Sequence, residues 1–184
     1  EPDYDMSITA PRLAGNKLFA SGIGHVGALL QLDAEKKTAN VLWRGTAKDA
    51  LYPANSTPFV EDGIIYGVDC QSGLLIGARL TDGARLWSTN APTSGEGRRQ
   101  KQATAFLVKH QDRFFLFSET GDLILAKLTP EGYEELDRFH VLEPTGECFG
   151  RKVVWNHPAF AERCMFVRND KELVCVDLSA EGKR

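Results

Sequence analysis

Long apolar runs, an excess of basic residues and a leader-like start are all missing from this 184-residue sequence. Its longest apolar stretches hold about five residues, whereas a helix that crosses a bilayer needs roughly 20. Lys and Arg number 22 against 25 Asp and Glu, so the net charge of −3 provides no basic face for nucleic acid. Residues 1–10 have neither the basic nor the apolar region of a signal peptide. We therefore expect no membrane span and no nucleic-acid partner.

Cysteine and histidine are scarce as well, with four of each in the chain. No two cysteines are adjacent or form a CxxC pair, and no histidine lies three to five residues from another histidine or cysteine. Neither a disulfide scaffold nor a metal site is therefore expected. Cys70, Cys164 and Cys175 should instead be small buried residues of strands.

The sequence does contain a repeat of about 48 residues. In residues 58–87, short apolar segments are separated by polar turns that carry Gly, which is the pattern of an antiparallel meander. The last apolar residue of the third segment recurs at spacings of 48, 48 and 50, at Leu32, Leu80, Leu128 and Leu178. An aromatic residue precedes each of these leucines by 12 to 14 positions, namely Phe19, Tyr66, Phe115 and Phe166.

A fourth segment follows in the first three units; it ends at Trp43 and Trp87 and reads ELDRF in the third. Units of about 40 to 50 residues with four antiparallel strands are typical of propeller blades, because stacking on neighbours buries both faces of each sheet. We predict an all-β fold, a β-propeller with four blades at approximately 11–45, 57–90, 103–142 and 153–184. The four blades would form either a complete ring or half of a seven- or eight-bladed propeller.

This register also assigns the core and the connections. The residues expected to be buried between blades are Tyr66, Phe115, Phe166, Leu80, Leu128 and Leu178. Long loops are expected at 46–56, 91–102 and 143–152, and only 28–37 and 157–165 have patterns compatible with a short helix. The GxGxxG motif at 22–27 is interpreted as a glycine-rich hairpin turn and not as a nucleotide loop, because the strand-like ALLQLD follows it.

The unit DGxxYxxDxxxGxLxxxxLxDGxxLW, which spans residues 62–87, resembles the PQQ-like repeat family of β-propellers. Together with ATAFLVKHQDRFFLFSETGDLILAKL and FGRKVVWNHPAFAERCMFVRNDKELVCVDL, it is similar to the carboxyl-terminal blades of planctomycete-type bacterial members. The resemblance covers about residues 11–178 and implies a propeller with a periplasmic or exported location. Enzymes of this family usually supply a vicinal disulfide, a calcium ion held by Glu and Asn, and a catalytic Asp. Since adjacent cysteines are missing here, the resemblance suggests PQQ but carries across no cofactor, metal or catalytic residue.

Charged residues of the turns and loops have two interpretations each. Asp69, Glu119, Asp122 and Asp170 lie in or beside Gly-containing turns, where carboxylates commonly accept backbone hydrogen bonds, so structural roles are favoured over metal or catalytic roles. A basic patch of Arg98, Arg99 and Lys101, with Arg151 and Lys152 in another loop, could bind an anionic ligand, although a solvated loop is favoured.

Trp155, Asn156 and His157 open the fourth unit, where an innermost strand would line the central channel of a propeller. These three polar-tipped side chains are candidates for ligand binding in that channel. The alternative is that His157, which precedes Pro158, caps a turn.

The favoured function is a non-catalytic β-propeller scaffold that presents loops to a protein or small-molecule partner. One alternative is a fragment of a PQQ-dependent quinoprotein oxidoreductase whose cofactor site lies in other blades. Another is an independent four-bladed ring that binds an ion in its channel. In a closed ring, residues 4–9 should pair with strand 173–178, whereas a half-disk should form a homodimer or join further amino-terminal blades.

Overall fold

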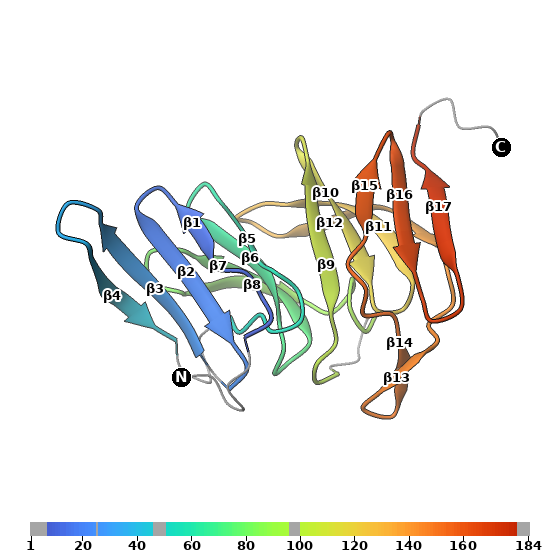
Figure 1. Ribbon diagram of the computed structural model, residues 1–184, viewed down its shortest axis with the longest axis horizontal. Coiled ribbons are helices and arrows are strands. Elements are labelled where there is room, and N and C mark those ends of the chain that lie inside the picture. The colour runs from blue at the N-terminus through green and yellow to red at the C-terminus, as the bar shows by residue number, and fades with distance from the viewer. Residues whose placement is uncertain (1–6, 25, 46–50, 96–99, 180–184) are drawn as a thin grey trace.

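The computed structural model describes residues 7–24, 26–45, 51–95 and 100–179, which form an all-β fold (Figure 1). This part of the chain contains 17 strands and no helix, so no helix that could cross a membrane is found in it. The strands form three four-stranded sheets, one three-stranded sheet and one two-stranded hairpin, and all pairings are antiparallel.

Within each sheet, strands that follow one another in the chain lie side by side. Sheet 1 contains β1 (Arg12–Ala14), β2 (Lys17–Gly22), β3 (Val26–Asp33) and β4 (Thr38–Arg44). Sheet 2 contains β5 (Phe59–Glu61), β6 (Ile64–Asp69), β7 (Leu74–Arg79) and β8 (Arg85–Thr89). Sheet 3 contains β9 (Ala105–His110), β10 (Arg113–Ser118), β11 (Asp122–Leu128) and β12 (Tyr133–His140). Sheet 4 contains β15 (Ala159–Ala161), β16 (Cys164–Arg168) and β17 (Leu173–Asp177), and the hairpin joins β13 (Gly146–Cys148) to β14 (Arg151–Val153).

The first turn of a sheet shows why the chain reverses where it does. Asp62 and Gly63 have φ values of 48° and 77° and form a two-residue connection between β5 and β6. Positive φ at both central positions belongs to the type I′ turn, whose twist matches that of paired strands. Glu162 and Arg163 adopt the same conformation in sheet 4, at φ values of 49° and 61°, without a glycine.

Sheet 2 is buried on both faces because it lies between sheets 1 and 3. All six residues of β6 are buried. Tyr66 and its neighbours on one face pack against sheet 3, and Ile65 and Ile76 on the other face pack against sheet 1. A third apolar cluster joins sheets 3 and 4 around Phe117, Leu123 and Met165. Apolar residues on both faces of the inner strands are thus explained by stacking, as the sequence predicts.

The outer strands of sheets 1 and 2 carry a tryptophan that seals the interface with the next sheet. Trp43 is paired with Leu29 and Trp87 with Gly77, and each pairing lies beside a β-bulge. The indole N–H of Trp43 donates to the carbonyl oxygen of Leu80 at 2.8 Å, and that of Trp87 donates to the carbonyl oxygen of Thr129 at 2.8 Å. Each ring therefore links its own sheet to the end of the third strand of the next.

Three expectations about local structure are wrong. Neither 28–37 nor 157–165 is helical, because β3 and β15–β16 occupy these stretches with strand pairing. The expected loop at 143–152 contains most of the β13–β14 hairpin. Among the cysteines, Cys70 is buried just after β6, but Cys164 is half-buried and Cys175 exposed, because both lie on the outer face of sheet 4. The GxGxxG motif does lie at the closed end of the β2–β3 hairpin, where Gly22 is paired with Val26.

The expected core is correct for three of its six residues. Tyr66, Leu80 and Leu128 are buried, at 4%, 6% and 8% exposure. Phe115, Phe166 and Leu178 are only half-buried. Phe166 belongs to the face of sheet 4 that is turned away from sheet 3, and Phe115 and Leu178 border an open cavity between these two sheets.

The sheets do not close into a ring, and Figure 1 shows sheets 1 and 4 at opposite ends of the molecule. Of the segment expected to pair with residues 173–178, residues 4–6 lie outside the described part of the chain. Ser7 donates to the carbonyl oxygen of Ser21, and Thr9 to that of Pro53, so residues 7–9 follow sheets 1 and 2. The closing pairing with β17 is therefore wrong for residues 7–9.

Candidate functional site

A buried polar residue lies at or just after the end of the second strand of sheets 2, 3 and 4 and ties the turn there to the linker that precedes the sheet. Asp69 accepts the backbone N–H of Tyr52 at 3.1 Å, and Glu119 accepts that of Thr104 at 3.2 Å. Asn169 donates its side-chain amide to the carbonyl oxygen of Glu143 at 2.9 Å. These hydrogen bonds satisfy backbone groups that would be costly to bury unpaired. They support structural roles for Asp69 and Glu119.

Glu119 is the centre of the most extensive buried polar cluster. Its carboxylate accepts hydrogen bonds from Arg151 Nε at 2.7 Å and Nη2 at 3.2 Å, and from the indole N–H of Trp155 at 2.8 Å. The side chain of Glu119 is 3% exposed and that of Arg151 16%. The bidentate pair therefore fixes β14 of the hairpin to the turn after β10. These hydrogen bonds are made within the protein, and they anchor the hairpin.

The three proposed channel residues lie directly before β15. Trp155 is half-buried and belongs to the Glu119 cluster. Asn156 is half-buried beside it. His157 is exposed, its Nδ1 lies 2.8 Å from the carbonyl oxygen of Pro158, and its ring is 5.3 Å from that of Phe106. The structure thus brings Trp155 to a structural carboxylate and places His157 against its own turn.

The basic patch is divided among separate environments. Arg98 and Arg99 lie outside the described residues. Lys101 is exposed in a turn before β9. Arg151 is held by Glu119, and Lys152 forms an exposed pair with Glu147 at 3.6 Å. Of the described members, Lys101 and Lys152 are on the surface and Arg151 is not.

A second polar cluster, which the sequence did not reveal, connects β11 and β12. Arg138 donates to Asp122 at 3.0 Å and to both oxygens of Glu135 at 2.9 Å, and it reaches the carbonyl oxygen of Ala91 at 3.0 Å. The ring of His140 lies between Asp122, at 2.7 Å, and Glu143, at 3.2 Å. The hydrogen bond to Asp122 is the main cause of a raised pKa for His140, and the negative charges of Asp122 and Glu143 add to it.

This cluster predicts a pH dependence of stability. Because the folded state raises the pKa of His140, its protonated form stabilises the fold fully below the ordinary pKa of about 6.5. This contribution is lost as the pH rises through the folded-state pKa. As the pH is raised from about 6.5 through the folded-state pKa, wild type should therefore lose stability relative to His140→Gln. Thermal melts of the two proteins in parallel measure this loss.

A matched control is His157→Gln, since the exposed His157 faces no carboxylate in the described structure. Asp122→Asn should return the NMR titration midpoint of His140 toward its ordinary value. A midpoint for His140 that is the same in wild type and Asp122→Asn would contradict the assignment.

Neither a reactive thiol at Cys70 nor a metal site is found in the described residues. Burial raises the pKa of the Cys70 thiol to about 11, with a smaller contribution from the charge of Asp69, so Cys70 is a poor nucleophile. No group of three or more His, Cys, Asp or Glu side chains there is arranged to hold a metal ion.

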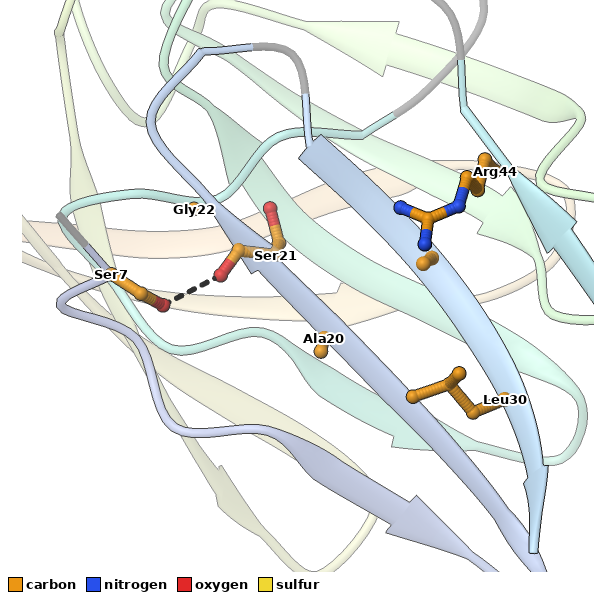
Figure 2. A pocket seen from close by; sticks show the side chains of 7 residues that line it. Ser7, Ala20, Ser21, Gly22, Leu30 and Arg44 are labelled. Carbon is orange, nitrogen blue, oxygen red and sulfur yellow. Dashed lines mark hydrogen bonds between the residues drawn. The ribbon is translucent and has the colours of Figure 1, made fainter. Parts of the chain in front are cut away.

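The two end sheets each present an open apolar face. On sheet 1, Leu13 and Val41 are 63% and 46% exposed, on the face turned away from sheet 2. A cavity of about 290 Å³ opens on the same sheet, between Ser7, Leu30 and Arg44 (Figure 2). On sheet 4, Leu173 is 70% exposed. In the interior of the stack, the corresponding faces are covered by the next sheet.

Comparison with known proteins supports the fold. No family model and no curated protein matches the chain. Among solved structures, BamB from Moraxella catarrhalis aligns with a TM-score of 0.55 and 10% identity, over 96% of this chain and 45% of that chain. The computationally designed protein Ika8 aligns with a TM-score of 0.58 and 12% identity, over 92% of this chain and 45% of that one. The designed protein Ika4 aligns with a TM-score of 0.54 and 13% identity, over 95% of this chain and 93% of that one.

These structural neighbours are β-propeller proteins. Identities of 10–13% show a shared fold alone. The chain spans 45% of the length of both BamB and Ika8.

Proposed function

We propose that this chain is a non-catalytic β-propeller scaffold of the PQQ-like repeat type, an arc of four blades that presents loops to a partner. The observation that carries the proposal is how the buried polar side chains are used. Asp69, Glu119 and Asn169 bind turns and linkers of their own chain, at or just after the end of the second strand in three successive sheets. Such an arrangement stiffens a repeated framework, and a catalytic group would instead need a side chain free to meet a substrate.

The arc would be completed by further blades. In each described interface, the face of one sheet that carries the second-strand aromatic packs on the following sheet. Phe166 belongs to that type of face on sheet 4, and Leu13 belongs to the receiving face on sheet 1. The two ends are therefore complementary, and a second copy related by a two-fold axis could cover both. An alignment over 45% of BamB is consistent with half of a larger disk.

Sedimentation velocity at micromolar concentration tests this arrangement. The 20.3 kDa chain should sediment as a dimer of about 40 kDa, because each open face leaves apolar side chains in water. Leu13→Glu, at a 63% exposed position on the receiving face, should give a monomer. Phe149→Glu is the matched control, since Phe149 is 70% exposed in the turn of the β13–β14 hairpin and belongs to neither end sheet. A monomeric wild type would contradict the half-disk.

Titration with PQQ in the presence of calcium tests the non-catalytic part of the proposal. Isothermal calorimetry should detect no binding in the micromolar range, and alcohols or sugars should not reduce a redox dye in the mixture. Tight binding accompanied by dye reduction would favour the quinoprotein alternative. This outcome is independent of the sedimentation result.

A further inference from the structure

The interface between sheets 3 and 4 has a cavity at the place where a tryptophan fills the two preceding interfaces. Asp137 is paired with Leu125, and this pairing lies beside a β-bulge like those next to Trp43 and Trp87. Leu125 follows Gly77, the partner of Trp87, by 48 residues. Asp137 therefore takes the position of the two tryptophans. A cavity of about 490 Å³ lies next to it, which we call the slot. Residues that line the slot include Phe115, Leu123, Leu125, Asp137, Phe139 and Leu178.

The aromatic residue of the second strand shows what is missing from the slot. The ring of Phe19 lies 5.9 Å from that of Trp43, and Phe19 is 1% exposed. The ring of Tyr66 lies 6.0 Å from that of Trp87, and Tyr66 is 4% exposed. Phe115, the corresponding residue of sheet 3, is stacked on Phe160 at 5.2 Å but remains half-buried. Its exposed part borders the slot, where an indole would otherwise lie.

The hydrogen-bond acceptor of the interface between sheets 1 and 2 also has a counterpart here. Leu80 accepts the N–H of Trp43, and its own N–H donates to the carbonyl oxygen of Gly63 in the first turn of its sheet. Leu178 donates in the same way to the carbonyl oxygen of Arg163, in the first turn of sheet 4. The carbonyl group of Leu178 therefore takes the position of the Leu80 carbonyl, which accepts the indole N–H of Trp43. The acceptor for Trp87, the carbonyl of Thr129, lies one residue further along its sheet.

We propose that the slot binds a small aromatic amine, a planar ring of indole size that bears an N–H and a protonated amino group. The ring would pack on Phe115 and the apolar residues of β11 and β17, in the manner of Trp43 and Trp87. The ring N–H would donate to the carbonyl oxygen of Leu178.

The charged residues that line the slot are Asp137, Asp177 and Arg138, and the position of the Arg138 guanidinium group decides which charge the slot favours. Asp137 shares the slot-facing side of its strand with Phe139, and one of its oxygens accepts the backbone N–H of Arg138 at 2.9 Å. The guanidinium group of Arg138 is turned to the opposite side of sheet 3, where it is paired with Asp122 and Glu135. The carboxylate of Asp137 is thus available to an ammonium group. Because the slot lies within one chain, this proposal does not depend on how the disk is completed.

Calorimetric titration of the full chain with tryptamine tests the proposal. One tryptamine should bind per chain with a dissociation constant below about 1 mM. Asp137→Asn should weaken binding roughly fivefold, since it removes one partly exposed ion pair. Asp112→Asn is the matched control and should leave binding unchanged, because Asp112 is 64% exposed in the turn between β9 and β10. Indole-3-propionate has a similar ring with a negative charge and should bind at least fivefold more weakly than tryptamine.

Asp137→Trp provides a second, structural readout. The new indole should occupy the slot, abolish tryptamine binding and raise the melting temperature. No binding of tryptamine at 1 mM would overturn the proposal, and a raised melting temperature in that case would mark the slot as a packing defect. Equal binding of tryptamine and indole-3-propionate, or equal affinities of wild type and Asp137→Asn, would also overturn it. If Asp137→Trp fails to fold, the comparison of Asp137→Asn with Asp112→Asn still decides.

Discussion

Glu119→Ala should lower the free energy of unfolding by about 3–5 kcal/mol. The change removes a carboxylate that is 3% exposed and leaves the guanidinium group of Arg151, 16% exposed, without its partner. It also leaves the indole N–H of Trp155 and the backbone N–H of Thr104 without an acceptor, and a buried donor without an acceptor costs free energy of its own. Urea unfolding monitored by circular dichroism measures the loss.

The hairpin offers a matched control for this experiment. Glu147 is paired with Lys152 at 3.6 Å, but their side chains are 72% and 60% exposed, so Glu147→Ala should cost less than about 1 kcal/mol. In the variant Glu119→Ala, amide exchange should rise first in β13 and β14, because the anchor of the hairpin is lost. Equal costs for Glu119→Ala and Glu147→Ala would show that Glu119 does not hold the hairpin.

The sheets could be predicted because their information is local. Gly-containing turns such as Asp62–Gly63 mark several of the reversals, and the 48-residue spacing of Leu32, Leu80 and Leu128 sets one register for successive sheets. The burial of Phe115 and Leu178 could not be predicted from that register. It depends on which side chains the neighbouring sheet contributes, and the third unit has an aspartate where the first two units have tryptophan.

The polar clusters were beyond the reach of sequence reasoning for a similar reason. Glu119 meets Arg151 and Trp155 only because the hairpin folds back over the turn after β10, and these residues are 32 and 36 positions away. The short segments of β13 and β14 have no apolar alternation that would mark them as strands. One signal was visible in advance: the sequence ELDRF stands where the first two units end in LW, and this substitution marks the slot.

The second large effect is expected at Trp87, whose ring holds sheets 2 and 3 together. The ring lies so close over Gly77 that a β-carbon there would be 2.4 Å from it, and it packs 6.0 Å from Tyr66. Its N–H donates to the carbonyl oxygen of Thr129, at the end of β11. Trp87→Ala should lower the free energy of unfolding by about 3 kcal/mol, near the lower end of the range for aromatic truncations, because Trp87 is half-buried.

Asp137→Ala is the control for Trp87→Ala. Asp137 stands at the corresponding position of sheet 3 and has no ring to lose, so its replacement should change stability by less than about 0.5 kcal/mol.

The close approach at Gly77 provides a sharper test. Gly77→Ala should be strongly destabilising in wild type, since the added methyl group forces the indole of Trp87 from its place. In the background of Trp87→Ala, the same substitution should cost little, so the two changes should be non-additive. Additive free energies of unfolding in this double-mutant cycle would show that Trp87 does not seal the interface, and the assignment of the slot to a missing tryptophan would fail with it.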